Sequence, residues 1–336
     1  MRQVRILLLL ALAGCSTGCS TGYGTGLPDG PSPEDQRADQ TGGVDGGRDQ
    51  LPPITTILCN GDCRDLVVSR LVLPTAATSA TLGLDLDGDG KVDNALGSIL
   101  GTLAAVSPST NTQHQLDESV FGGSVLLLLR IQASDFVNTS QAVAQVWRGA
   151  GESCCTNPDD LPQCKAQALA DCFGGSHTFQ LHLTSPSSAI LGGTISAGAV
   201  RLGPSALTLT LQLSGASTLD LALRSVYVMG QLGSSGLSHG VIAGVVPRTE
   251  IDGKLIPMMA TMLNDTLTDP TASQSTRDTI RNLFDANHDG LVDLTEVQSN
   301  GLVKTLLAGD VDVDHDGSAE LSLGLGFEAV AAIIGS

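Results

Sequence analysis

The sequence predicts a mainly β fold with some α-helix, in which antiparallel strands form a β-sandwich-like body. Leucines alternate with polar residues over 207–213 and again over 219–223, so these two segments are expected to form a β-hairpin. The continuously apolar run 125–131 indicates a strand that is buried on both faces. Because the strand patterns lack the helix spacing of βαβ units, antiparallel pairing is favoured over a parallel sheet.

The first fourteen residues are predicted to be a targeting segment. Arginines open the chain, and the apolar run 6–13 is shorter than the ~20 residues that a membrane-spanning helix needs. The run ends in Leu12-Ala13-Gly14-Cys15, which resembles the lipobox of bacterial lipoproteins. The resemblance implies that residues 1–14 are removed, that Cys15 is lipidated and anchors the protein in a membrane, and that Ser16 favours the outer membrane. An ordinary signal peptide cut nearby is the alternative.

The rest of the chain is expected to divide into three parts. Residues 15–50 are rich in Gly, Ser, Thr, Asp and Pro and predict a disordered tether. Residues 51–250 are expected to form a β-rich domain, and residues 251–336 a C-terminal region that packs on it. The net charge of −18 argues against a nucleic-acid partner, which selects basic surfaces, and suits an exported protein that binds cations.

Helices are expected at Asn94–Val106, Gln115–Phe121 and Lys254–Leu263, and alternation around Phe179 predicts a further strand. Six cysteines follow the tether, and export places them in an oxidising compartment, which favours disulfides over zinc. Neighbouring cysteines form a bridge only with strain, so Cys154 and Cys155 are expected to bond to different partners. The disulfide candidates are Cys59, Cys63, Cys154, Cys155, Cys164 and Cys172.

The stretch Asp285–Glu296 has oxygen-bearing side chains at positions 1, 3, 5, 9 and 12, with glycine at position 6. This spacing resembles the twelve-residue EF-hand calcium loop, in which hard oxygen ligands surround the ion. An entering helix is expected over Ser275–Phe284, and a weaker exit helix over Leu294–Leu307, which Asn300-Gly301 interrupts. The ligands that the resemblance implies are Asp285, Asn287, Asp289, the Leu291 carbonyl, Asp293 and Glu296.

Two shorter loops have the pattern DxDxDG and resemble the calcium loops of thrombospondin type 3 repeats. Position 12 is leucine in both, so water or another part of the fold must complete the coordination shell. A solvated acidic turn without metal is the alternative for each. A strand is expected after the second loop, over 321–327, because its residues alternate. The candidate ligands are Asp85, Asp87, Asp89, Lys91 and Asp93 in the first loop, and Asp312, Asp314, Asp316, Ser318 and Glu320 in the second.

The sequence shows no catalytic constellation with good spacing, so two classes of function remain open. The first is an exported calcium-binding lipoprotein in which calcium is mainly structural, with a polysaccharide or protein as a possible partner at the cell surface. The second is a calcium-stabilised hydrolase whose catalytic residues are dispersed. An exposed Trp147 or Tyr227 on a flat sheet face favours the binding protein, whereas a cleft that holds two carboxylates outside the loops favours the enzyme.

Overall fold

The fold is described from a computed structural model, in residues 59, 62–75, 77–97, 99, 112–183, 190–214, 217–270 and 272–335. The expected signal peptide, the tether and Cys15 lie outside these residues, as does most of the helix expected at Asn94–Val106. Within this part of the chain, no helix is long and apolar enough to cross a membrane.

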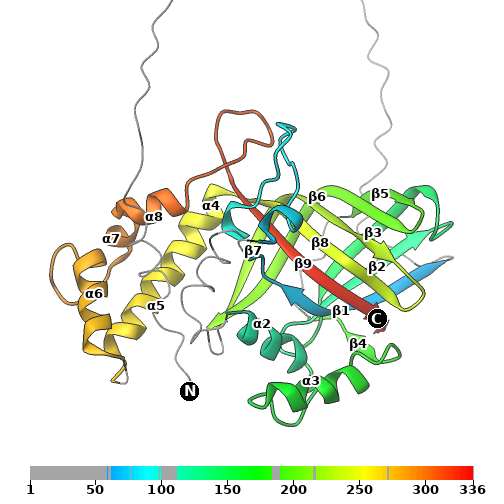
Figure 1. Cartoon of the computed structure of the whole chain (residues 1–336), viewed down its shortest axis with the longest axis horizontal. Coiled ribbons are helices and arrows are strands. Elements are labelled where there is room, and N and C mark those ends of the chain that lie inside the picture. Colours follow the sequence, from blue (N-terminus) through cyan, green and yellow to red (C-terminus); the bar gives the residue numbers. More distant parts are fainter. Residues whose placement is uncertain are drawn as a thin grey trace, which may run out of the picture.

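A closed antiparallel barrel forms the body of the molecule (Figure 1). The predicted mainly β class and antiparallel pairing are therefore confirmed, but the strands close into one sheet rather than packing as a sandwich. Strands of both architectures alternate apolar and polar residues, so the local pattern does not distinguish them. In barrel order the strands are β1 Cys63–Val72, β2 Leu127–Ala133, β3 Thr139–Arg148, β5 Leu191–Ser196, β6 Ala199–Ser214, β7 Ser217–Leu232, β8 Gly236–Val246 and β9 Leu321–Ala331.

The expected hairpin is the longest pairing in the barrel. Leu209 of β6 lies opposite Leu221 of β7, and both side chains are buried. The last strand of the barrel, β9, closes it because β9 pairs with β8 on one side and with β1 on the other. In the pairing with β1, Val72 lies opposite Gly326. The apolar run that predicted a buried strand corresponds to β2, and its leucines belong to the core.

Disulfides hold a small helical segment outside the barrel. The helix α3, Leu161–Ala170, begins at an Asp160 cap and lies beside α2, Thr112–Phe121. The short strand β4, Thr178–Gln180, pairs in parallel with β10, Ile333–Gly335. The expected oxidation of all six cysteines agrees with the structure, and the two neighbouring cysteines have different partners. The bonds are Cys59–Cys63, Cys154–Cys172 and Cys155–Cys164.

The C-terminal helices form a separate arm beside the barrel (Figure 1). The arm is fixed to β7 through Glu250, whose carboxylate accepts the N–H of Ala222 at 2.9 Å, and through Lys254, which donates to the carbonyl of Asp220 at 2.8 Å. The expected interruption at Asn300 is confirmed, because its side chain caps a new helix there. The elements are α4 Arg248–Glu250, η2 Ile251–Leu255, α5 Ile256–Thr268, α6 Gln274–Phe284, α7 Leu294–Ser299 and α8 Gly301–Leu306.

Candidate cation-binding loops

The three acidic loops share one hydrogen-bonding frame. The N–H of the glycine at position 6 donates to the carboxylate at position 1, and the three distances are all 3.0 Å. The N–H at position 7 donates to the carboxylate at position 5, at 2.7–2.9 Å. These bonds turn the backbone around the carboxylates of positions 1 and 5. The first pairs are Gly90–Asp85, Gly290–Asp285 and Gly317–Asp312, and the second are Lys91–Asp89, Leu291–Asp289 and Ser318–Asp316.

The same two positions of each loop have a left-handed backbone. Position 6 is glycine throughout, with φ between 86° and 91°. A Cβ on Gly290 would meet nothing within 4 Å, so glycine is required there for its backbone conformation and not for space. Position 4 is Gly88 in the first loop, but His288 and His315 in the others, with φ of 59° and 57°. The three loops therefore have the same turn.

Loop 285–296 is closed by a buried carboxylate. Glu296 accepts the N–H of Asn287 at one oxygen, at 3.0 Å, and the N–H of Asp293 at the other, at 2.9 Å. Asp293 in turn caps α7, because its carboxylate accepts the N–H of Glu296 at 2.8 Å. Asp285 directly follows α6 and is only 3% exposed. The first and last predicted ligands are thus both buried, at the junctions of the loop with its helices.

Loop 312–320 brings its three aspartates together. Carboxylate oxygens of Asp312, Asp314 and Asp316 all lie within 4.8 Å of one another. Glu320 is 8% exposed, and its Oε2 is the buried side-chain oxygen that has no hydrogen-bond partner among the described residues. Burial raises the pKa of Glu320, and the negative charges of Asp314 and Asp316 raise it further. A buried carboxylate oxygen without a donor is costly, and a cation would satisfy it.

Loop 85–93 gathers a different subset of its acids. Asp85, Asp87 and Asp93 have oxygens within 4.8 Å of one another. Asp89 instead accepts a hydrogen bond from the ammonium group of Lys91 at 2.5 Å, which lowers the pKa of this carboxyl. Burial raises the pKa of Asp93, and the negative charges of Asp87, Asp310 and Asp89 add to this effect.

A single antiparallel bridge closes each of the two shorter loops. The N–H at position 9 donates to the carbonyl of the residue that precedes the loop, at 2.7 Å both for Asp93 with Leu84 and for Glu320 with Val311. Their first and ninth positions are therefore held as neighbours without the exit helix of loop 285–296. This explains why a leucine at position 12 does not prevent the turn from forming.

Comparison with known proteins adds nothing to this geometry. No family model, curated protein or solved structure matches this chain. The arguments about function therefore rest on the loops themselves.

Another cluster of metal-ligand types lies near α3. Glu152, Cys172 and His177 have ligand atoms within 4.8 Å of one another. Cys172 is bonded to Cys154, however, so it offers no thiolate, and the ring Nε2 of His177 lies 2.9 Å from a Glu152 oxygen. This group is accounted for as a disulfide beside a hydrogen-bonded histidine and glutamate.

The aromatic side chains that we considered for ligand stacking have protein partners. Trp147 is 7% exposed and lies under the guanidinium of Arg130, and Tyr227 lies under that of Arg201. Trp147 is therefore not the exposed aromatic residue that would favour a binding protein.

The residues that hold the loops in place lie outside the set predicted from the sequence. Asn264 of α5 bonds to the backbone of Val292, while Asn94, Asp310 and Ser322 connect the two shorter loops. Their signal in the sequence is weak, because a single asparagine or serine beside an acidic loop is common. Only the three-dimensional arrangement shows what they contact.

Proposed function

We propose that this protein binds calcium in three loops and that calcium has a mainly structural role. The observation that carries the proposal is the shared frame, in which position 6 donates to position 1 at 3.0 Å in every loop. In loop 285–296, which connects α6 to α7, it supports the resemblance to an EF-hand. A chance acidic turn has no reason to repeat in three places with the same left-handed positions.

The chemistry of the donors favours calcium. The side chains that line the loops offer carboxylate or amide oxygen, and the two histidines at position 4 occupy places without a ligand role. Calcium takes six to eight oxygen ligands in flexible geometry, whereas zinc and copper prefer nitrogen and sulfur. Magnesium binds oxygen too, but demands near-octahedral geometry and gives up its water reluctantly.

The positions of the loops support a structural role. Loop 312–320 runs directly into β9, the strand that closes the barrel, and loop 85–93 lies against the same strand through Asn94. Bound calcium would relieve the repulsion among clustered carboxylates and fix these connections. We further propose that the protein is exported, that it is lipid-anchored at Cys15 in the outer membrane, which Ser16 favours, and that it has a binding or structural task at the cell surface.

Titration calorimetry of the folded domain tests the proposal. After chelator treatment and dialysis, calcium is expected to bind with a stoichiometry near three, and magnesium to compete weakly. A triple variant that removes the first ligand of every loop is the matched control. It combines Asp85→Asn, Asp285→Asn and Asp312→Asn. The proposal is overturned if the triple variant still releases or absorbs heat on binding calcium, or if the wild type shows no heat of calcium binding.

A further inference from the structure

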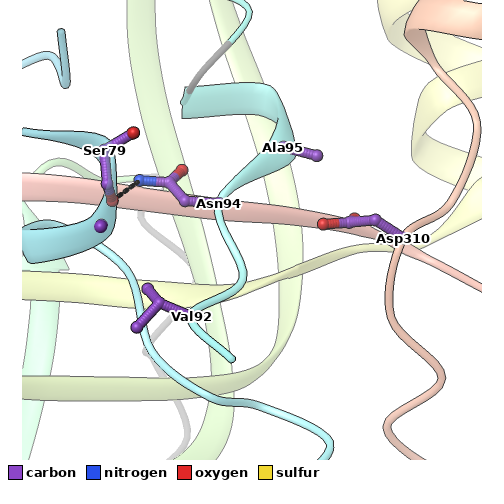
Figure 2. A pocket seen from close by; sticks show the side chains of 6 residues that line it. Ser79, Val92, Asn94, Ala95 and Asp310 are labelled. Carbon is purple, nitrogen blue, oxygen red and sulfur yellow. Dashed lines mark hydrogen bonds between the residues drawn. The ribbon is translucent and has the colours of Figure 1, made fainter. Parts of the chain in front are cut away.

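The two shorter loops are neighbours at one end of the barrel, although more than two hundred residues separate them in the chain. The segment that holds loop 85–93 and the segment that holds loop 312–320 stand side by side there (Figure 1). Figure 2 shows Asp310 facing Ala95, while the side chain of Asn94 points towards Ser79. These residues line a pocket of about 260 Å³. The two loops are therefore in a position to affect each other.

A chain of hydrogen bonds crosses the junction. The N–H of Ala95 donates to the hydroxyl of Ser322 at 2.7 Å, and this hydroxyl donates to one carboxylate oxygen of Asp310 at 2.5 Å. The backbone N–H of Ser322 donates to the other oxygen of Asp310 at 2.7 Å. Ala95 lies two residues after Asp93, and Ser322 two residues after Glu320. The chain thus connects the ninth positions of both loops.

Asn94 makes a second connection and is 5% exposed. Its Oδ1 accepts the N–H of Gly324 at 2.8 Å, and its Nδ2 lies 3.2 Å from the carbonyl of the same residue. The pairing of β1 with β9 ends at Gly326, so Asn94 takes the next place along the edge of β9. A Cβ on Gly324 would lie 2.0 Å from the carbonyl oxygen of Leu82, so this close approach requires glycine.

The orphaned oxygen of Glu320 is an independent sign that a cation belongs in loop 312–320. It is a buried acceptor at position 9 of its loop, and the charges of Asp314 and Asp316 lie close to it. The ninth position of the other loop, Asp93, experiences the negative charge of Asp310. Positive charge placed at either loop therefore relieves repulsion that acts across the junction.

The charges allow both loops to fill. Loop 85–93 holds four aspartates and one lysine, a net charge of −3, and loop 312–320 holds three aspartates and one glutamate, −4. One Ca²⁺ leaves them at about −1 and −2, since each ion neutralises two charges. A filled loop still attracts the second ion, so direct repulsion between the ions does not decide the outcome.

We propose that loops 85–93 and 312–320 form one two-cation site, in which an ion in either loop raises the affinity of the other. This inference rests on the proposed calcium binding. The first ion orders its loop and, through Ser322 and Asn94, the loop across the junction, so the second ion meets a site that is already arranged. Loop 285–296 has the same turn, but the residues that the structure describes form no such junction beside it, and it binds independently.

Site-specific titration distinguishes the loops. The backbone amides of Gly90, Gly290 and Gly317 each donate to the first carboxylate of their own loop, so their NMR resonances report the filling of each site. In Asp312→Asn, the calcium affinity reported by Gly90 is expected to fall at least about five-fold. The affinity reported by Gly290 stays unchanged. In Asp85→Asn, the calcium affinity reported by Gly317 is expected to fall by the same factor.

Two further variants test the route of the coupling. Ser322→Ala removes the hydroxyl that connects Ala95 to Asp310, and Asp310→Ala removes the carboxylate that accepts both the N–H and the hydroxyl of Ser322. In either background, Asp312→Asn is expected to lower the calcium affinity at Gly90 less than it does in the otherwise wild-type protein, because only the Asn94 connection remains. If Asp312→Asn as a single substitution leaves the calcium affinity reported by Gly90 unchanged, the two-cation site is refuted while calcium binding stands. If no glycine resonance responds to calcium at all, the proposed function itself fails.

Discussion

The side-chain amide of Asn264 takes the place of a neighbouring strand beside Val292. Its Nδ2 donates to the carbonyl of Val292 at 2.8 Å, and its Oδ1 accepts the N–H of the same residue at 2.9 Å. Val292 is buried at position 8 of loop 285–296, between the two halves of the turn. One residue of α5 therefore fixes the middle of the loop without a second loop beside it.

Asn264→Ala is expected to weaken calcium binding at loop 285–296 by roughly thirty-fold. Two hydrogen bonds to the backbone are lost, and each contributes about 1 kcal/mol, while tenfold in affinity corresponds to about 1.4 kcal/mol. Titration that follows the Gly290 amide measures the effect. Thr261→Ala, on an exposed face of the same helix, is the matched control. Equal affinities for Asn264→Ala and this control would show that the amide does not position the loop.

Chelation is expected to lower the melting temperature. A site at ten times its Kd contributes about 1.4 kcal/mol, so three sites give roughly 4 kcal/mol, which is a large share of the stability of a typical domain. Differential scanning calorimetry with calcium and with chelator should show a fall of about 10 °C, and calcium should restore the original value. An unchanged melting temperature would exclude the structural role. Apolar surface exposed by chelator without unfolding would indicate a switch instead.

Glu296→Gln is expected to remove part of that difference. The glutamine keeps the size of the side chain and one oxygen acceptor, but it loses the charge and the second oxygen for the ion. Asn287 and Asp293 donate to the two carboxylate oxygens, so one of these hydrogen bonds is lost as well. For this reason the comparison is made between the calcium-dependent shifts of the wild type and the variant, and not between their absolute melting temperatures. Identical shifts would contradict a ligand role for Glu296.

Lys91→Ala is expected to strengthen calcium binding in loop 85–93 several-fold. The ammonium group holds the carboxylate of Asp89 at 2.5 Å and competes with a cation for it. Its removal frees position 5 and makes the loop more negative. The Gly90 amide reports the affinity, and Lys91→Arg serves as the control that keeps the charge. Weaker binding in Lys91→Ala would mean that Asp89 takes no part in the site.

Anchoring is tested at Cys15. The motif Leu12–Cys15 predicts that expressed protein partitions into detergent and carries an acyl label, because two or three acyl chains hold a protein in a membrane stably. Cys15→Ser should abolish the label and release or misprocess the protein, whereas Cys19→Ser should have no effect. A freely soluble, unlabelled protein cut at another position would refute the lipoprotein assignment.

Local chemistry predicted the elements better than their arrangement. The turn of each acidic loop follows from its own residues, because the carboxylates at positions 1 and 5 accept bonds from the glycine and the residue after it. The break at Asn300 and the hairpin of β6 and β7 also follow from neighbouring residues. Barrel closure does not, since it depends on Val72 meeting Gly326. The contacts of Asn264 and Asn94 likewise join segments far apart, which no local pattern encodes.

The seam between β1 and β9 has a consequence for the order of events during synthesis. The barrel's first strand acquires its second neighbour only when residues 321–331 are available, about 250 residues after β1. Until then, the outer edge of β1 offers unpaired backbone groups, which invite pairing with other chains. Pairings this distant in sequence form slowly. A nascent chain therefore has to be kept from premature association until β9, the strand that closes the barrel, has emerged.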